Sequence, residues 1–282
     1  MMIVNTIEEV RNLIKGWRKE GLSVGFVPTM GALHEGHQSL MERAVSQNDR
    51  VVASIFVNPT QFGPNEDFEA YPRDLEKDVA LCKEVGVHVV FAPQGEELYF
   101  PDKATTVHIS GITDVLCGSK RPGHFDGVCL VVSKFFNIIQ PDRAYFGQKD
   151  AQQVAVIKRM VRDLNYEIEI VSCPIVREAD GLAKSSRNLY LSKEEREAAL
   201  VLNKSLEFVK KALDQGERNA SILKAAILSC IIQEPLAKID YVEVVEMESL
   251  QSISGDINCP ILIPIAVYIG KTRLIDNITY AV

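Results

Sequence analysis

The chain has 282 residues, of which 46% are apolar and 24% charged, and its formal net charge is −7. This composition supports a substantial core, and the length suits two domains of ordinary size. With 31 Lys and Arg against 38 Asp and Glu, there is no basic excess to neutralise a nucleic-acid backbone. No run of about 20 apolar residues suits a bilayer. We therefore expect neither a nucleic-acid nor a membrane partner.

The N-terminal segment and the cysteines indicate a compartment. The first 17 residues mix Glu8, Glu9 and Arg11 with scattered apolar side chains and lack the apolar centre of a signal peptide. The six cysteines lie far apart with no C-x-x-C pair, which favours free thiols over zinc or redox chemistry. The sequence thus predicts a soluble, cytoplasmic protein.

Short apolar runs alternate with helical periodicity along residues 1–175. This alternation is typical of a doubly wound parallel sheet, that is, a Rossmann-like α/β domain. Strands are predicted at 23–27, 51–57, 87–91, 144–146 and 167–173, the first of them ending at Pro28. Helices are predicted at 37–47, 73–84, 128–140 and 151–164.

The pattern changes after Pro174, and we interpret residues 176–282 as a smaller α+β domain. No repeat or low-complexity tract separates the two parts, so ordered chain is expected to join them. Gly181 lies in a polar turn that could serve as a hinge, and we expect the second domain to close over the site. Its helices are predicted at 193–214 and 219–232, and its strands near 240–247 and 261–269.

The loop at residues 28–37, Pro-Thr-Met-Gly-Ala-Leu-His-Glu-Gly-His, follows the first predicted strand and leads into a helix. Ligands of open parallel sheets bind beyond the carboxyl ends of the strands. The glycines permit close backbone approach, and a helix N-terminus offers N–H groups to a phosphate. His34 and His37 could stabilise charge on a phosphoryl group. Alternatively they cap the helix, or supply two ligands of a zinc site, although no third His or Cys lies nearby.

Two further loops carry groups suited to a substrate. Asn58 and Gln61 follow the strand at 51–57, and their neutral amides suit hydroxyls or a carboxylate, unless the loop is only an ordinary turn. Lys149 and Asp150 follow the strand at 144–146 and suit a phosphate and a ribose, unless they are only a solvated helix start.

The segment at 181–188, Gly-Leu-Ala-Lys-Ser-Ser-Arg-Asn, places two cations and two hydroxyls near the predicted domain junction. Such a cluster can wrap a pyrophosphate, and a solvated basic turn is the alternative. The loop at 121–127, which contains His124, is similarly polar, but its chemistry is not readable from sequence. His88 and His108 fall in predicted strands, and we interpret them as structural.

Several common motifs are absent. There is no G-x-x-x-x-G-K-[ST] loop and no G-x-G-x-x-G, so ATP would have to bind through histidines and helix ends. There is also no G-x-S-x-G motif, so a covalent acyl-enzyme has no evident carrier.

His34-Glu35-Gly36-His37 resembles the H-x-G-H box of the nucleotidyltransferase superfamily, and Lys184-Ser185-Ser186-Arg187 resembles its K-M-S-K-S loop. More narrowly, PTMGALHEGH, FVNPTQF, RPGHFDGV, FGQKDAQQ, GLAKSSRN and RLIDN occur in the order seen in the pantothenate synthetase family. This resemblance covers essentially the whole chain. It implies ATP-dependent joining of pantoate to β-alanine through a pantoyl-adenylate, with release of pyrophosphate and AMP.

The resemblance also implies roles for the matching residues. Gln61 and Gln153 would bind pantoate, and His34, His37, Lys149 and Arg187 would be catalytic. The family's proton-donor role falls on His37, but we expect His37 to stabilise charge, because pyrophosphate is a good leaving group. ATP would be bound by Met30, Gly31, Ala32, Leu33, His34, Glu35, Gly36, His37, Gly147, Gln148, Lys149, Asp150, Val176, Lys184, Ser185, Ser186 and Arg187.

A magnesium ion on the ATP phosphates and a homodimer are further implications of the resemblance. No metal ligand is assigned, because Asp78 has Lys77 rather than a second carboxylate beside it. Two other functions remain open. A nucleotidyltransferase acting on a phosphate acceptor would want more cations than the Gln61 and Gln153 pair offers. A non-catalytic nucleotide sensor would not need intact His34 and His37.

Overall fold

The computed structural model describes residues 1–64 and 66–281, and the chain forms two compact units. The first unit comprises Met1–Gln148 and Val156–Pro174. The second comprises Lys149–Ala155 and Ile175–Val282. Closure of the second unit over a site stays a prediction.

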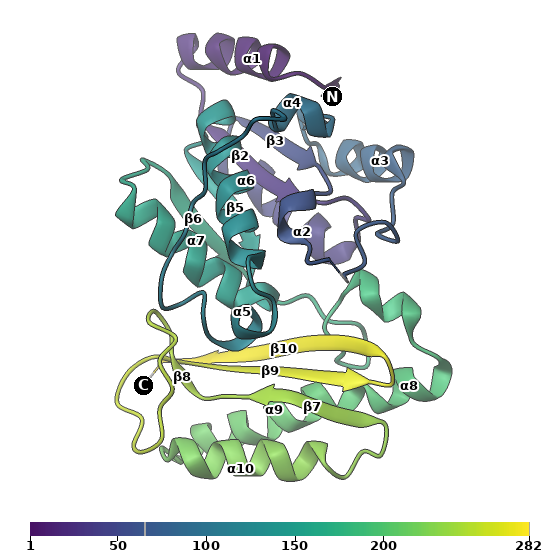
Figure 1. The fold of residues 1–282 in the computed structure, drawn as a ribbon, viewed down its shortest axis with the longest axis vertical. Helices are drawn as coiled ribbons and strands as arrows, with labels where there is room; N and C mark the ends of the chain where they lie inside the picture. The colour runs from purple at the N-terminus through teal and green to yellow at the C-terminus, as the bar shows by residue number, and fades with distance from the viewer. Residues whose placement is uncertain (65, 282) are drawn as a thin grey trace. The chain divides into compact units, whose positions relative to one another are not determined.

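The first unit contains the strands β1 (Met2–Val4), β2 (Val24–Thr29), β3 (Arg50–Ile55), β4 (Val89–Phe91), β5 (Arg143–Gly147) and β6 (Glu169–Cys173). They form one parallel sheet with the order β1-β4-β3-β2-β5-β6 (Figure 1). From β2 the chain moves outward to β3 and β4 and later returns to β5, so the order reverses between β2 and β5. The predicted doubly wound α/β class is confirmed, and its switch point adjoins the loop after β2.

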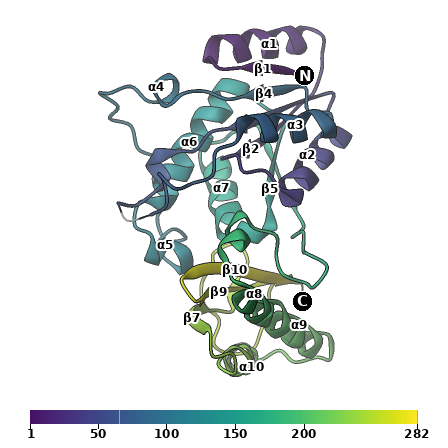
Figure 2. The same ribbon diagram turned by 90° about the vertical axis from the view of Figure 1, so that its right-hand side faces the viewer.

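The helices of this unit are α1 (Ile7–Lys19), α2 (Glu35–Gln47), α3 (Leu75–Val85), α4 (Gly95–Leu98), α5 (Leu116–Lys120), α6 (His124–Ile139) and α7 (Ala151–Asp163) from Val156 on, with the short turn η1 (Pro59–Gln61). The turn η2 (Gln148–Asp150) and the first part of α7 contain residues 149–155, which belong to the second unit. In Figure 2, α6 lies on one side of the strands and α2 and α3 on the other. Phe135 of α6 meets Phe26 and Phe91 of the sheet edge to face. Met41 of α2 packs in the opposite cluster with Val27. Burial of both faces explains the continuous apolar runs of the strands.

The first predicted strand does not end at Pro28, because β2 continues to Thr29. The Val24 carbonyl accepts the N–H of Asp142, just before β5, and the Thr29 carbonyl accepts the N–H of Phe56, just after β3. Backbone groups of successive residues in a strand point to opposite sides, so the N–H and C=O groups of even-numbered residues in β2, Pro28 included, face β5. Pairing between β2 and β5 stops at Phe26. The missing N–H of Pro28 therefore breaks no hydrogen bond of the sheet.

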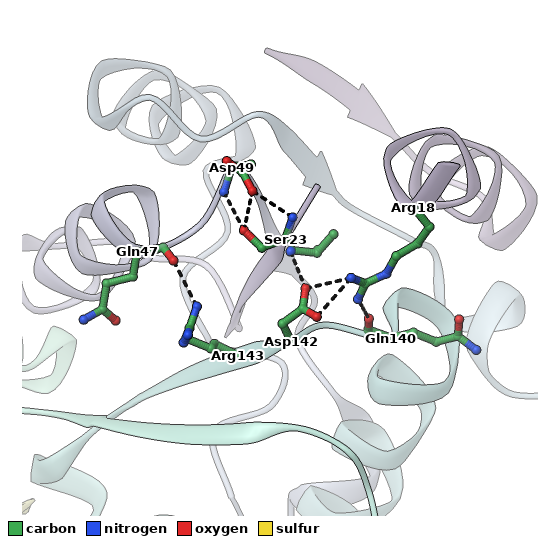
Figure 3. Close-up of polar contacts among 8 residues, drawn as sticks. Arg18, Ser23, Gln47, Asp49, Gln140, Asp142 and Arg143 are labelled. Carbon is green, nitrogen blue, oxygen red and sulfur yellow. Dashed lines mark hydrogen bonds and ion pairs between the residues drawn. The ribbon is translucent and has the colours of Figure 1, made fainter. Parts of the chain in front are cut away.

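A polar cluster ties together the amino ends of β2 and β5 (Figure 3). Asp142 accepts hydrogen bonds from the Val24 N–H at 2.6 Å and from the Arg18 guanidinium at 2.8 Å. Asp49 accepts from the backbone and hydroxyl of Ser23. Because these groups satisfy strand starts, they stabilise the end of the sheet away from the loops that follow the strands.

The second unit contains a four-stranded antiparallel sheet in which β9 pairs with β10, β7 and β8. Apolar side chains of α9, α10 and β9 form its core, among them Leu206, Ile227 and Ile265. Its elements are η3 (Ser186–Tyr190), α8 (Lys193–Ala198), α9 (Leu200–Asp214), α10 (Ala220–Ile231), β7 (Ala237–Val242), β8 (Val245–Glu246), β9 (Ile261–Ile269) and β10 (Thr272–Tyr280).

Two predicted elements of this unit were wrong in extent. The helix at 193–214 divides at Ala199, whose carbonyl accepts from Leu202 three residues on, a tighter turn than an α-helix. The strand near 240–247 divides into β7 and β8. Glu243 donates to the Pro264 carbonyl, but Pro264 has no N–H to return, so the ladder is interrupted there.

The placement of two histidines in strands was also wrong. His88 precedes β4 and still has a structural role, since its Nδ1 accepts the Val51 N–H at 3.1 Å. His108 lies in irregular chain, and its ring pairs with Asp126 at 2.9 Å in an exposed position.

Candidate active site

The loop between β2 and α2 is shaped by one buried carboxylate. Asp78, at the start of α3 and 2% exposed, accepts the N–H groups of Ala32 at 3.0 Å and Leu33 at 2.7 Å. Gly31 has φ +82°, and a Cβ there would lie 2.8 Å from an Asp78 oxygen. Burial raises the pKa of Asp78, and the two backbone hydrogen bonds oppose that rise. The carboxylate therefore holds the loop in a conformation that only glycine suits at position 31.

His34 and His37 cap the helix that follows this loop. His34 is the N-cap of α2, and its Nδ1 accepts the Gly36 N–H at 3.1 Å. The Nδ1 of His37 accepts the His34 N–H at 3.3 Å, and the two ring centroids lie 4.2 Å apart. The capping alternative is thus confirmed.

The same hydrogen bonds fix the tautomer of both histidines. A neutral imidazole that accepts at Nδ1 carries its proton at Nε2. Both Nε2–H groups are therefore donors. Both rings lie at the N-terminus of α2, the positive end of its dipole. Capping uses the Nδ1 of each ring and occupies the backbone N–H groups of His34 and Gly36, whereas a phosphate would be met by the Nε2–H groups.

Gln61 is brought to the same loop. Its side chain is 8% exposed, and its Nε2 lies 3.0 Å from the Met30 sulfur. Its Oε1 accepts from Asn58 at 3.0 Å, and the Asn58 Oδ1 accepts in turn from the Tyr99 hydroxyl at 2.8 Å. Asn58, whose amide the sequence offered as a substrate group, instead holds the Gln61 amide in one orientation together with Tyr99, which the sequence did not single out.

The segment at 121–127, whose chemistry the sequence left unread, supports the backbone of Gln61. From His124 on it is not a loop but the first turn of α6, which begins four residues before the predicted start at Val128. Arg121 donates to the Nε2 of His124 at 2.9 Å, so His124 must carry its proton at Nδ1 and donate it to the Gln61 carbonyl at 2.8 Å. The Nε of Arg121 also binds Glu66 at 2.6 Å. This hydrogen bond is the largest cause that lowers the pKa of Glu66. The segment thus positions Gln61 through a chain of hydrogen bonds.

The remaining candidates of the first unit, Gly147 and Gln148, lie at the carboxyl end of β5 and in η2. Lys149, Asp150 and Gln153 belong to the second unit. The Lys149 amine lies 3.9 Å from the Asp150 carboxylate, too long for a hydrogen bond.

The segment predicted to bind phosphates forms a hairpin. Val176 accepts the Lys184 N–H at 2.9 Å, and Gly181 makes the turn with φ +96°. The Ser185 hydroxyl then caps η3 by accepting the Arg187 N–H at 3.3 Å. The segment is therefore an ordered loop, and its binding of phosphate stays a prediction.

An ion-pair network braces this hairpin. Arg196 of α8 binds Glu178 at 2.8 Å and Asp180 at 2.7 Å. Burial opposes ionisation of Glu178, but hydrogen bonds from Arg196 and Asn188 outweigh it and lower the Glu178 pKa. Asn188 also donates to the Ala183 carbonyl, so the hairpin and η3 are held together.

Among the described residues, no group of three or more His, Cys, Asp or Glu side chains is placed to hold a metal ion. Both oxygens of Asp78 already accept backbone N–H groups. Within the same residues, no helix is long and apolar enough to cross a bilayer.

Known proteins match the chain along nearly its whole length. The family model for pantoate–β-alanine ligase matches residues 2–279. The pantothenate synthetases of Clostridium acetobutylicum and Clostridioides difficile are 62% and 61% identical to this chain, with 99% of each chain covered. The crystal structure of the Thermus thermophilus pantothenate synthetase is 46% identical with a TM-score of 0.91, covering 99% of both chains.

A pantoate–β-alanine ligase from Francisella tularensis, complexed with beta-gamma ATP and β-alanine, is 37% identical with a TM-score of 0.78. The match covers 99% of this chain and 97% of that one.

Proposed function

The chain belongs to the pantoate–β-alanine ligase family and catalyses the ATP-dependent condensation of pantoate with β-alanine, and we propose that it does so through a pantoyl-adenylate. A pantoate carboxylate oxygen attacks the α-phosphorus of ATP, and the bond from that phosphorus to the bridging oxygen breaks to release pyrophosphate. The amine of β-alanine then attacks the activated carbonyl carbon, loses a proton and displaces AMP. Pantothenate is the product.

The observation that carries the proposal is the capped pair of histidines at the start of α2. Their Nε2–H groups are fixed as donors before the reaction begins, because each Nδ1 accepts a backbone N–H at the helix start. Donors held in this way stabilise charge that develops on a phosphoryl group without reorganising. We assign this role to His34 and His37, and we assign no proton transfer to His37.

Other residues would hold the rest of ATP. Lys149, Ser185, Ser186 and Arg187 would bind its phosphates, and Gly147 and Asp150 its ribose. The backbone of Val176 would meet the adenine. Further ATP contacts are assigned to Met30, Gly31, Ala32, Leu33, Glu35, Gly36, Gln148 and Lys184.

Gln61 and Gln153 would bind the hydroxyls and carboxylate of pantoate. A neutral amide orients an anion without an opposing charge, so the carboxylate keeps its nucleophilicity. The Asn58 contact, which fixes the Oε1 of Gln61 as an acceptor, supports this assignment. Closure of the second unit over bound substrates is part of the same proposal.

Magnesium would enter with ATP. Mg²⁺ in ATP sites is bound largely by substrate phosphates and water, with one or two carboxylates. The described residues offer no dedicated cluster, which fits a metal carried on the triphosphate. We assign it no protein ligand.

We further propose that the enzyme is a homodimer in the cytoplasm. The family resemblance supports the dimer, and the six free cysteines together with the use of ATP support a reducing compartment. Light scattering during size-exclusion chromatography would give the mass directly, to be compared with 31.4 kDa for one chain.

The test of the proposed chemistry is release of pyrophosphate and AMP from Mg-ATP with pantoate, with β-alanine, with both, or with neither. Stoichiometric pyrophosphate with pantoate alone and sustained AMP only with both substrates are expected. Absence of pantoate-dependent release would refute the adenylate.

A second comparison separates an enzyme from a nucleotide sensor. His37→Ala should keep its ATP affinity and lose roughly 100-fold in kcat, the usual effect of removing one preorganised donor. Unchanged turnover in this variant would remove His37 from the catalytic machinery.

A further inference from the structure

One segment that the sequence analysis singled out has no role in the chemistry above. This is Arg273-Leu274-Ile275-Asp276-Asn277 in β10. Asp276 and Asn277 are 2% and 3% exposed, although both are polar. Buried polar groups need partners. The partner of Asn277 is Lys149, which is assigned to the phosphates of ATP, and the partner of Asp276 is Arg177, in the hairpin that leads to the Ser185–Arg187 segment.

Asp276 holds the hairpin that precedes η3. The Arg177 guanidinium donates to both of its oxygens, at 2.7 and 2.9 Å. The same guanidinium donates to the Gly181 carbonyl at 3.1 Å. Since a fork of two hydrogen bonds fixes orientation as well as distance, Asp276 determines where the turn at Gly181 lies.

Asn277 holds the other phosphate-binding segment. Its Nδ2 donates to the Lys149 carbonyl at 3.0 Å, and its own N–H donates to an Asp276 oxygen at 2.8 Å. β10 also contacts η3, which contains Ser186 and Arg187. Two adjacent residues of one strand therefore connect the backbone of Lys149 to the hairpin and η3. All of these groups belong to the second unit.

We propose that Asp276 and Asn277 are positioning residues that set the distance between Lys149 and the Ser185–Arg187 segment. That distance determines how well these groups fit the triphosphate of ATP. The inference rests on the proposed binding of phosphates by these residues. β10 suits the task because it pairs with β9 over nine residues, from Thr272 to Tyr280, and sites on regular strands are more rigid than sites on loops.

A purely structural role explains these contacts less well. A buried ion pair contributes little net stability, because desolvation of both charges offsets their attraction. Apolar side chains would pack this position at lower cost, as they do at neighbouring Leu274, which is 5% exposed. Positioning of a substrate-binding loop gives a reason for the polar arrangement.

The test is a double-mutant cycle between Asn277→Ala and Lys149→Ala, measured as pantoate-dependent exchange of labelled pyrophosphate into ATP by the full-length enzyme. Asn277→Ala alone should lower kcat/KM for ATP about tenfold, the size expected for one buried hydrogen bond. In the Lys149→Ala background it should have almost no further effect, because the group that it positions is gone.

The outcomes distinguish the positioning role from the proposed binding of phosphate. If Lys149→Ala lowers exchange but the two effects multiply, Asn277 does not act through Lys149 and the positioning role is overturned. If Lys149→Ala exchanges like the wild type, the proposed binding of phosphate by Lys149 fails, and the positioning role fails with it. Wild-type exchange by Asn277→Ala would also overturn the inference.

Ile278→Ala is the matched control, because Ile278 is the next residue in β10 and packs on the apolar core of the unit. It should lower the melting temperature without changing KM for ATP. Should Asn277→Ala fail to fold, Arg177→Lys replaces it, since Lys keeps the charge but loses the fork. The same cycle is then run between Arg177→Lys and Arg187→Ala. If Arg177→Lys has little further effect on exchange in the Arg187→Ala background, the inference is supported, and if the two losses in kcat/KM multiply, it is overturned.

Discussion

Asp78→Asn is expected to damage the loop before α2 without removing any group assigned to substrate. Asn retains one acceptor, so either the Ala32 or the Leu33 N–H loses its partner and faces an NH₂ group instead. Loss of a hydrogen bond to a charged acceptor costs about 1.5–3 kcal/mol, and a buried donor without a partner costs a further 1–3 kcal/mol. Asn is neutral, so it avoids the cost of desolvating the charge, which is the same effect that raises the Asp78 pKa, and this offsets part of the loss. We therefore expect about 3 kcal/mol of destabilisation.

The kinetic consequence follows from the backbone. Ala32 has φ +50°, an unfavourable conformation for a side chain, and the Asp78 hydrogen bond holds it there. Once released, the loop should relax, and kcat/KM should fall by roughly 100-fold, as for small displacements of catalytic groups.

The assay pairs urea unfolding with the steady-state rate of AMP release. Asp74→Ala is the matched control, because Asp74 caps the same helix by accepting the Lys77 N–H, whereas the Ala32 and Leu33 N–H groups of the loop bind Asp78. It should lose about 1 kcal/mol and keep its kcat/KM. Wild-type kcat/KM in Asp78→Asn would refute the argument that this carboxylate shapes the site.

Three further predictions concern other parts of the chain. His124→Phe removes the donor to the Gln61 carbonyl and should raise KM for pantoate about fivefold while leaving KM for ATP unchanged in initial-rate assays. The Glu178 pKa lies below its ordinary 4.5, so its ion pair stabilises the protein above that pH and is lost as pH falls through the lowered pKa. The difference in melting temperature between wild type and Arg196→Gln should therefore be full above pH 4.5 and shrink below it, whereas a constant difference would contradict the ion pair. Asp142→Ala should cost about 1–2 kcal/mol in urea unfolding with unchanged kcat/KM, because Asp142 acts at the amino ends of the strands.

The parallel sheet could be predicted because its strands are buried on both faces. Runs such as 51–57 and 87–91 are apolar except for Ser54 and His88, and the helices that alternate with the strands carry clear periodicity. The end of β2 could not be predicted, since the effect of Pro28 depends on where β5 stops pairing. β10 was missed although Gly270-Lys271 joins two runs rich in β-branched residues, a pattern that indicates a two-residue hairpin.

The candidate site divides in the same way. The box from His34 to His37 was readable as a helix start, and its spacing left capping open as one alternative among three. The role of Asp78 was not readable, because it depends on a contact across 45 residues to Leu33. The support of Gln61 by His124 spans 63 residues and likewise needs the fold. Local chemistry could be predicted, and long-range hydrogen bonding could not.

The pantoyl-adenylate is tested most directly by following the carboxylate oxygens of pantoate. With pantoate labelled by heavy oxygen in its carboxyl group, ATP and β-alanine, one labelled oxygen should appear in the phosphoryl group of AMP, because the α-phosphorus–oxygen bond forms before the amide. The other labelled oxygen should remain in the amide of pantothenate. AMP without label, or label in pyrophosphate, would contradict attack of the carboxylate on the α-phosphorus and with it the central claim.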